Sequence, residues 1–321
     1  MGSDGGAGDS YWKALFDFAN RVGSSYDGES GSGSRVARMS EQDRRWLERA
    51  MAEYARATDP VVQMRQHIAV FLELNYDTPS EEELATAERA HEQLVDLIVD
   101  LDCAQDFHKI GGFRILASLL RSPRAKLRFC GCSLIGELAQ NNDYCQRHLV
   151  EAAVVPVLLE MATVGADVDC QTKALFGLSC VCRGSPEAAA QFLQADGLVR
   201  LSAAMRSSSS DRFVTKAAFY FGALRPDLQA TAAQWKKPVG ALVEALLQSS
   251  VTQEQERLRQ LLKALLSLLG DSGRDAATDP LLSEEQRLAL ASWAKSWRRE
   301  SCEDNDCETA ESLERLLKRI R

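Results

Sequence analysis

Two cysteine pairs have the residue types and spacing that could do chemistry. One residue separates Cys130 from Cys132, and one separates Cys180 from Cys182, so each pair could hold a metal or form a redox couple. Structural zinc sites, however, use pairs that are spaced by at least two residues. Both pairs also lie in segments with helical patterning, where positions i and i+2 project roughly 200° apart. The pattern therefore predicts four cysteines packed in a core and no metal site.

The other chemically capable residues lack the spacing of an active site. None of the four histidines belongs to an HExxH motif; they are His67, His91, His108 and His148. There is no GxSxG segment and no set of kinase motifs. Gly111 and Gly112 lie between predicted helices rather than after a strand, so they do not form a phosphate loop. The sequence predicts that the protein is not an enzyme and uses no cofactor.

Composition excludes further classes. The chain has 321 residues with a net charge of −8, which does not suggest a nucleic-acid partner. It has no run of about 18 apolar residues, so we expect no membrane span. The nine cysteines are scattered and odd in number, and no apolar leader follows Met1. We therefore expect reduced thiols in a cytoplasmic or nuclear protein.

The helices that would position these residues recur at a fixed period. Segments 127–138, 170–181 and 213–224 share one helical pattern and follow one another at a step of 43 residues. Such a period is typical of armadillo and HEAT arrays. We expect an all-α, right-handed, armadillo-like superhelical solenoid with helical caps at both ends. Gly112 and Gly197 are predicted to permit a left-handed helix end and a close backbone approach between the first and second helices of their repeats.

A solenoid with caps at both ends is expected to be a monomer. Composition also divides the chain into four segments. The predicted segments are a flexible region 1–38 with a short apolar helix at 11–22 and a Gly/Ser linker, capping helices at 39–90, armadillo-like repeats at 91–270 and terminal helices at 271–321.

The third helix of each repeat should line the concave face. Armadillo proteins that bind extended peptides carry a Trp and, four residues later, an Asn on these helices in successive repeats. Here the corresponding pairs are Ser133 and Glu137, Phe176 and Cys180, and Phe219 and Ala223. Because the Asn ladder is missing, we expect a folded, convex partner rather than an extended peptide.

Basic residues also fall on the predicted third helices, and two interpretations are open. They are Arg128, Lys173, Arg183 and Lys216. They could form a solvated charged face, or a positive stripe complementary to an acidic partner, which would act mostly on association rate and register.

Several motifs resemble, in order, those of the heat-shock-protein-70-binding armadillo family. The stretch from Leu94 to Gly112 is similar to its first repeat, including an Asp-x-Ala-x-Asp turn, and Lys173 to Arg183 is similar to one of its third helices. Segments 135–142 and 39–51 also match family patterns, so the resemblance covers roughly 39–225.

The resemblance implies a nucleotide exchange factor that grips one lobe of the ATPase domain of heat-shock protein 70 with its concave face and promotes ADP release. A small Ala104 would allow close approach of the partner, and Arg183 is the foremost contact. The implied partner-binding residues are Ala104, Asp106, Arg128, Glu137, Lys173, Phe176, Arg183, Lys216 and Phe219. The alternative is an armadillo scaffold or adaptor without exchange activity.

The apolar island at 11–22 allows two interpretations. Trp12, Leu15 and Phe16 fall on one helical stripe ahead of a Gly/Ser linker. The island could be a fraying terminus. It also resembles the family's N-terminal segment, which implies help with peptide release at the chaperone's substrate-binding domain.

Overall fold

The computed structural model describes residues 41–164, 167–249, 255–270, 281–300 and 307–320. The chain divides into two compact units, 1–63 and 64–321. The apolar island at 11–22 and the linker after it lie outside the described residues, as does the expected cap residue Ser40. The finer division expected from composition, with boundaries after residues 38, 90 and 270, stays a prediction.

The described part of the first unit is helical. Helix α2 (Glu41–Thr58) is followed by the first turn of α3 (Pro60–Glu73). The side chain of Asp59 accepts a hydrogen bond from the Val61 amide at 2.8 Å. Proline suits the first helical position after it, because an amide there would have no partner within the helix.

The described residues of the second unit are all-helical, which confirms the predicted fold class. After the remainder of α3, its helices are α4 (Glu81–Ile98), α5 (Leu101–Lys109), α6 (Arg114–Arg121), α7 (Ala125–Ala139), α8 (Asp143–Glu151), α9 (Val154–Val164), α10 (Val168–Cys182), α11 (Pro186–Gln194), α12 (Gly197–Ser207), α13 (Asp211–Leu224), α14 (Ala232–Leu247), α15 (Gln255–Leu269), α16 (Glu284–Glu300) and α17 (Cys307–Ile320).

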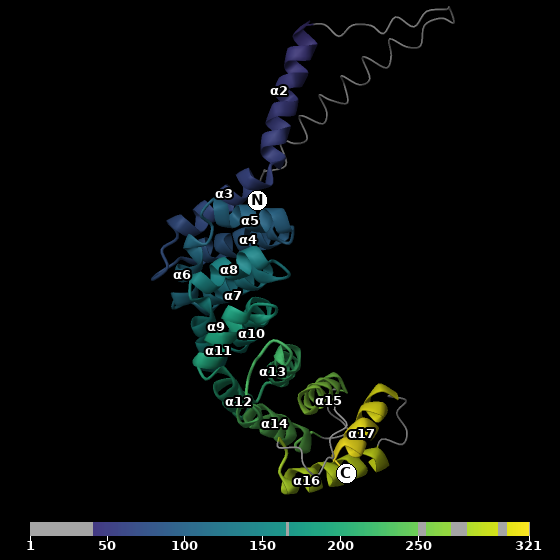
Figure 1. The fold of residues 1–321 in the computed structure, drawn as a ribbon. Coiled ribbons are helices and arrows are strands. Elements are labelled where there is room, and N and C mark those ends of the chain that lie inside the picture. Colours follow the sequence, from purple (N-terminus) through teal and green to yellow (C-terminus); the bar gives the residue numbers. More distant parts are fainter. Residues whose placement is uncertain (1–40, 165–166, 250–254, 271–280, 301–306, 321) are drawn as a thin grey trace, which may run out of the picture. The chain divides into compact units, whose positions relative to one another are not determined.

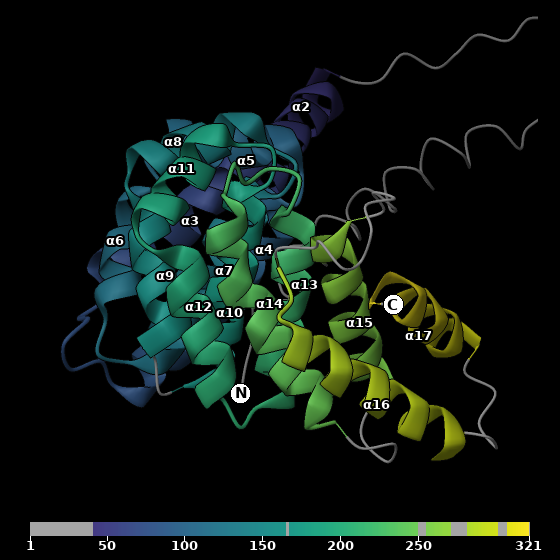
Figure 2. The ribbon, with the colours of Figure 1, turned by 60° about the horizontal axis from the view of Figure 1, so that its bottom comes forward.

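These helices stack in rows, so each repeat packs on its neighbours in sequence (Figure 1). The third helices α7, α10 and α13 form one row, which α4 precedes and α15 and α17 continue. The second helices α9 and α12 pack on each other, and α14 and α16 extend that row. In Figure 2 the first helices α5, α8 and α11 gather at the top of the view. This is the nearest-neighbour packing of a solenoid, as predicted.

Side-chain caps fix where many of these helices begin. Ser80 and Glu83 form the capping box expected at the start of α4, with the Ser80 amide donating to Glu83 Oε2 at 2.7 Å. Asn142 and Ser185 cap α8 and α11 by accepting from backbone amides three residues ahead. Local sequence therefore sets where these helices begin.

The corners between first and second helices correct one expectation. The left-handed residues are Gly111, with φ of 89°, and Asp196, with φ of 54°, each one position before the predicted glycine. Gly112 and Gly197 are needed for the close approach that was also predicted at these corners. A Cβ on Gly112 would lie 2.6 Å from the ring of Phe107, and Gly197 meets a ring in the same way. These glycines permit close approach rather than an unusual φ.

The cysteine pairs pack mainly as predicted. Cys130, Cys132 and Cys182 are buried, whereas Cys180 is half-buried on α10. Within the described ranges, no group of three or more His, Cys, Asp or Glu residues is arranged to hold a metal ion. None of the helices described is long and apolar enough to cross a membrane.

Candidate partner-binding surface

The accessible stripe of the third helices is the surface that the sequence singled out. On α10, residues at spacings of three and four, such as Lys173, Phe176 and Cys180, share one side of the helix. We call the accessible side chains of this stripe the third-helix face: Phe129 and Glu137 of α7, Lys173, Phe176 and Cys180 of α10 with Arg183 at its C-cap, and Lys216 and Phe219 of α13.

A lysine held between two rings occupies the centre of this face. Lys173 Nζ lies 5.6 Å from the ring centroid of Phe129 and 5.0 Å from that of Phe176. It also lies 3.8 Å from Glu137 Oε1 on the neighbouring helix. The ring faces and the carboxylate both attract the ammonium group. Lys173 therefore contacts two other predicted site residues, Glu137 and Phe176, and also Phe129.

Phe176 owes its position to a glycine on α7. A Cβ on Gly136 would lie 2.3 Å from Cε1 of Phe176, so the ring rests directly on the α7 backbone. This leaves Phe176 half-buried, with one side against α7 and the other toward Lys173. The close packing of α7 on α10 thus fixes the aromatic side of the lysine site.

A buried histidine lies beside the same cluster. His91 of α4 is 9% exposed, and its ring stands edge-on to Phe129 at a centroid distance of 6.3 Å. Its Nε2 atom has no hydrogen-bond partner among the described residues. Burial lowers the pKa of His91 to about 4, and the Lys173 charge adds to the effect while Glu88 opposes it. The imidazole is therefore neutral at physiological pH.

Ion pairs link successive third helices along the stack. They are Lys126 with Glu88 at 2.7 Å, Arg212 with Asp169, and Arg257 with Asp211 at 3.2 Å. Pairs at exposed positions contribute about 0–1 kcal/mol each. Their main consequence is that most charges on these helices already have partners within the chain.

Two cationic side chains and one aromatic ring on the third-helix face are exposed and available to contact a partner. Arg183, the C-cap of α10, and Lys216 of α13 are exposed, and neither forms an ion pair within the described part of the chain. Phe219, one helical turn from Lys216, is 47% exposed. An exposed aromatic side chain beside unpaired cations is the composition expected of a contact surface.

Arg128 does not belong to this surface, which corrects the predicted four-residue basic stripe. It lies nine residues before Glu137, about half a turn away around α7. Its Nη1 donates to the carbonyls of Ser122 and Pro123 at 2.9 and 2.8 Å. The guanidinium thus holds the α6–α7 loop, and the basic residues of the stripe reduce to Lys173, Arg183 and Lys216.

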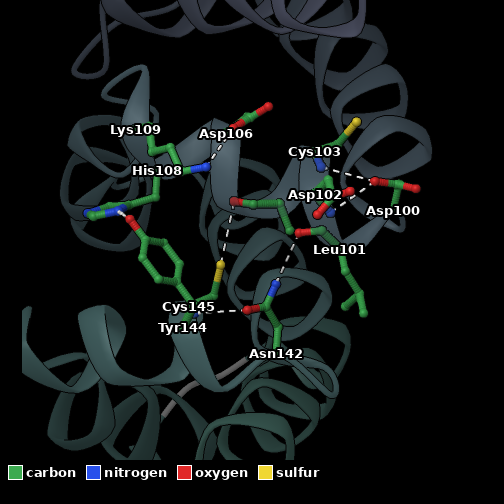
Figure 3. A network of polar contacts seen from close by, with 11 residues as sticks. Asp100, Leu101, Asp102, Cys103, Asp106, His108, Lys109, Asn142, Tyr144 and Cys145 are labelled. Carbon is green, nitrogen blue, oxygen red and sulfur yellow. Dashed lines mark hydrogen bonds and ion pairs between the residues drawn. The ribbon is translucent and has the colours of Figure 1, made fainter.

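The first-repeat turn also differs from expectation (Figure 3). Ala104 is 1% exposed, and its carbonyl accepts a hydrogen bond from Cys145 Sγ at 3.5 Å. The idea that its small side chain offers a close approach at the surface is therefore wrong, and a larger residue there would enter the α5–α8 packing. Asp106 remains accessible, although it pairs with Lys109 at 2.9 Å.

His108 and His148, which the repeat alignment placed at comparable positions, do come together. Their rings stack at a centroid distance of 4.1 Å. His108 Nδ1 also lies 2.9 Å from the Tyr144 hydroxyl, as Figure 3 shows. Burial and the neighbouring His148 lower the pKa of His108. His148 contacts Glu151 at 2.9 Å. These contacts join α5 to α8 and do not reach the third-helix face.

Sequence reasoning missed two members of the central cluster. Phe129 lies eight residues before Glu137 on the same helical stripe, a spacing that could have revealed it. His91 lies close to one 43-residue period before Ser133, in a helix whose first part was predicted to be a cap. It was missed because the recurring segments begin at residue 127.

A family model and several known proteins are similar in sequence to this chain. Residues 103–224 match the family model of the SIL1/FES1/HPBP1 C-terminal domain. The chain is 29% identical to Hsp70-binding protein 1 of Rattus norvegicus over 261 residues, which are 78% of this chain and 71% of the rat protein. It is 30% identical to the Hsp70 nucleotide exchange factor FES1 of Mycosarcoma maydis over 34% of this chain and 28% of the fungal protein.

Solved structures bear on the fold alone. A designed armadillo repeat protein superimposes with a TM-score of 0.54 at 16% identity, covering 80% of this chain and 99% of the designed one. The armadillo-like arrangement of the helices is thereby confirmed.

Proposed function

We propose, from its similarity to Hsp70-binding protein 1 and to the Hsp70 nucleotide exchange factor FES1, that this chain belongs to the same family and is a cochaperone that accelerates ADP release from heat-shock protein 70. In this proposal the third-helix face grips one lobe of the chaperone's ATPase domain. The protein acts as a monomer in the cytoplasm, and a nuclear pool is compatible with the proposal. No catalytic side chain is required, because the protein acts by binding.

The observation that carries the proposal is the set of open groups on the third-helix face. Arg183, Lys216 and Phe219 are accessible and lie on adjacent helices, while Lys173 is held in place by its rings and by Glu137. A face with fixed side chains loses little conformational entropy when it binds a rigid partner. It lacks the Asn ladder that would hydrogen-bond an extended peptide, which favours a folded lobe.

The proposed mechanism is a shift of population. Tight nucleotide binding requires both lobes of the ATPase domain to contact the nucleotide. A clamp that fits one lobe only when it is displaced favours the open arrangement, in which ADP leaves faster. Moving such an equilibrium from 1:99 to 99:1 requires about 5.5 kcal/mol of differential affinity. Several contacts of hot-spot strength can supply this.

Arg183→Ala tests the surface assignment. We expect the substitution to weaken chaperone binding by about 1–2 kcal/mol, or roughly five- to thirtyfold, because it removes an exposed charged contact. Stopped-flow release of labelled ADP from heat-shock protein 70 measures the consequence directly.

Arg147→Ala is the matched control, since Arg147 is an exposed arginine on α8, away from the third-helix face. Equal acceleration of ADP release by both variants would reject the surface. A wild-type protein that binds the chaperone but leaves ADP release unchanged would instead favour the scaffold or adaptor.

The segment at 11–22 has a separate proposed role. Its apolar stripe, with Trp12, Leu15 and Phe16, suits the peptide groove of the chaperone's substrate-binding domain. Competition for that groove would help a bound peptide leave after ADP has been released. The proposal is supported by sequence pattern alone.

A further inference from the structure

We propose that Gln146 is a positioning residue that fixes the end of α10 and thereby presents Arg183 to the partner. The inference rests on the proposed function, because it assumes that Arg183 contacts the chaperone. Gln146 belongs to α8, the first helix of the repeat whose third helix, α10, ends at Arg183, and is 6% exposed. It is too buried to touch a partner itself and would act only through the backbone it holds.

The side-chain amide of Gln146 bonds to the ends of two consecutive third helices. Its Nε2 donates to the carbonyl of Cys180 at 2.8 Å and to that of Arg183 at 3.1 Å, both at the end of α10. It also lies 3.2 Å from the carbonyl of Ala139, the last residue of α7. The last carbonyls of a helix have no partner inside that helix, so an outside donor is needed when they are buried. The side-chain amide of Gln146 therefore lies within hydrogen-bond distance of carbonyls at the ends of both α7 and α10.

These bonds limit the movement of the residues around Arg183. The Arg183 amide donates to the Ser179 carbonyl at 3.2 Å, which closes the last turn of α10. Gly184 follows with φ of 72°, and the Ser185 amide then donates to the Cys182 carbonyl at 3.3 Å. With its own carbonyl also held, Arg183 has a fixed backbone while its side chain is free in solvent. Its reach from the third-helix face is thus set before a partner arrives.

The neighbouring repeats show that ordinary packing does not require this glutamine. Gln146 is the fourth residue of α8, and the fourth residues of α5 and α11 are Ala104 and Ala189. Both alanines are buried, at 1% and 3% exposure. Of these three first helices, only α8 carries at its fourth position an amide side chain that reaches the end of a third helix, α10. Gln146→Ala consequently reproduces the side chain that the other two repeats use and is a matched substitution.

Hydrogen exchange tests the fixed turn without any chaperone. In Gln146→Ala we expect the amides of Arg183 and Ser185 to exchange about fivefold faster, as loss of one net hydrogen bond implies. Amides in the middle of α13 should keep their rates. Unchanged exchange at residues 183–185, or equal acceleration throughout the repeats, would overturn the inference, whatever the chaperone does.

A binding cycle tests the consequence for the partner. Gln146→Ala should weaken binding of heat-shock protein 70 about three- to tenfold, since Arg183 must then be ordered on binding. The same change should have little effect in an Arg183→Ala background but its full effect in a Lys216→Ala background, because Gln146 does not touch α13.

The outcomes separate the two proposals. Equal loss in both backgrounds would mean a general structural role and would overturn the positioning inference, as would no loss at all in the wild-type background. If Arg183→Ala alone leaves binding intact, the surface assignment and the inference built on it both fall. If the wild-type protein does not bind the chaperone, the proposed function fails, and hydrogen exchange still decides whether Gln146 fixes the turn.

Discussion

The buried imidazole of His91 should make the stability of this protein depend on pH between about 7 and 4. Its pKa in the folded chain is about 4, against 6.5 for the free side chain. Because the folded-state pKa is the lower one, the unfolded chain binds more protons in this range. The stability associated with neutral His91 is complete above pH 6.5 and is lost as pH falls toward 4.

The size of the effect follows from the shift. One pKa unit corresponds to about 1.4 kcal/mol, so the loss relative to neutral pH is about 2 kcal/mol at pH 5 and about 3 kcal/mol at pH 4. That is a large part of the roughly 5–15 kcal/mol that stabilises a typical domain. Other groups also titrate in this range, so the contribution of His91 must be isolated by substitution.

His91→Leu provides that comparison. Leucine keeps an apolar contact with Phe129 and removes the Nε2 atom that has no hydrogen-bond partner. Urea unfolding of both proteins at pH 7, 5 and 4 measures the difference in unfolding free energy. We expect the variant to gain about 2 kcal/mol relative to wild type between pH 7 and pH 5. Parallel pH profiles for the two proteins would refute the argument that burial keeps His91 neutral.

Two further changes test other contacts. Gly136→Ala should drive the ring of Phe176 off α7 and cost about 1–3 kcal/mol in urea unfolding, because the new Cβ would lie 2.3 Å from that ring; adding Phe176→Leu should restore much of the loss, and a single variant more stable than wild type would contradict the packing. Deleting residues 1–22 should leave stopped-flow ADP release unchanged and slow the departure of a labelled peptide from the chaperone; equal peptide release by both forms would remove the proposed role of the N-terminal island.

Much of the fold could be predicted because its signals are local. The 43-residue step revealed the repeats, and the Ser80–Glu83 box marked the start of α4. Such signals act within a few residues, or repeat at a fixed interval, so they survive without knowledge of the packing. Glu137, Lys173 and Phe176 were each predicted as partner-binding residues, and Lys173 lies beside the other two because adjacent third helices pack on one another.

The errors at the candidate site have a common physical cause. Ala104 and Arg128 were assigned from family position and helix membership, which do not say which side of a helix meets a neighbour. In the folded chain, Ala104 packs between α5 and α8, and Arg128 turns to the α6–α7 loop. The corner glycines show the same limit, since the need for Gly112 comes from a ring five residues away rather than from its own φ.

The sequence by itself determined the helical period, the caps, the buried cysteines and the absence of an Asn ladder, because each depends on residue type and spacing along one chain. Tertiary structure alone decided that Lys173 lies between two rings, that buried His91 finds no hydrogen-bond partner for Nε2 among the described residues, and that Gln146 reaches the turn of Arg183. These arrangements depend on the lateral fit of one repeat against the next. Differences of an ångström in that fit decide which side chains are held and which remain open to a partner.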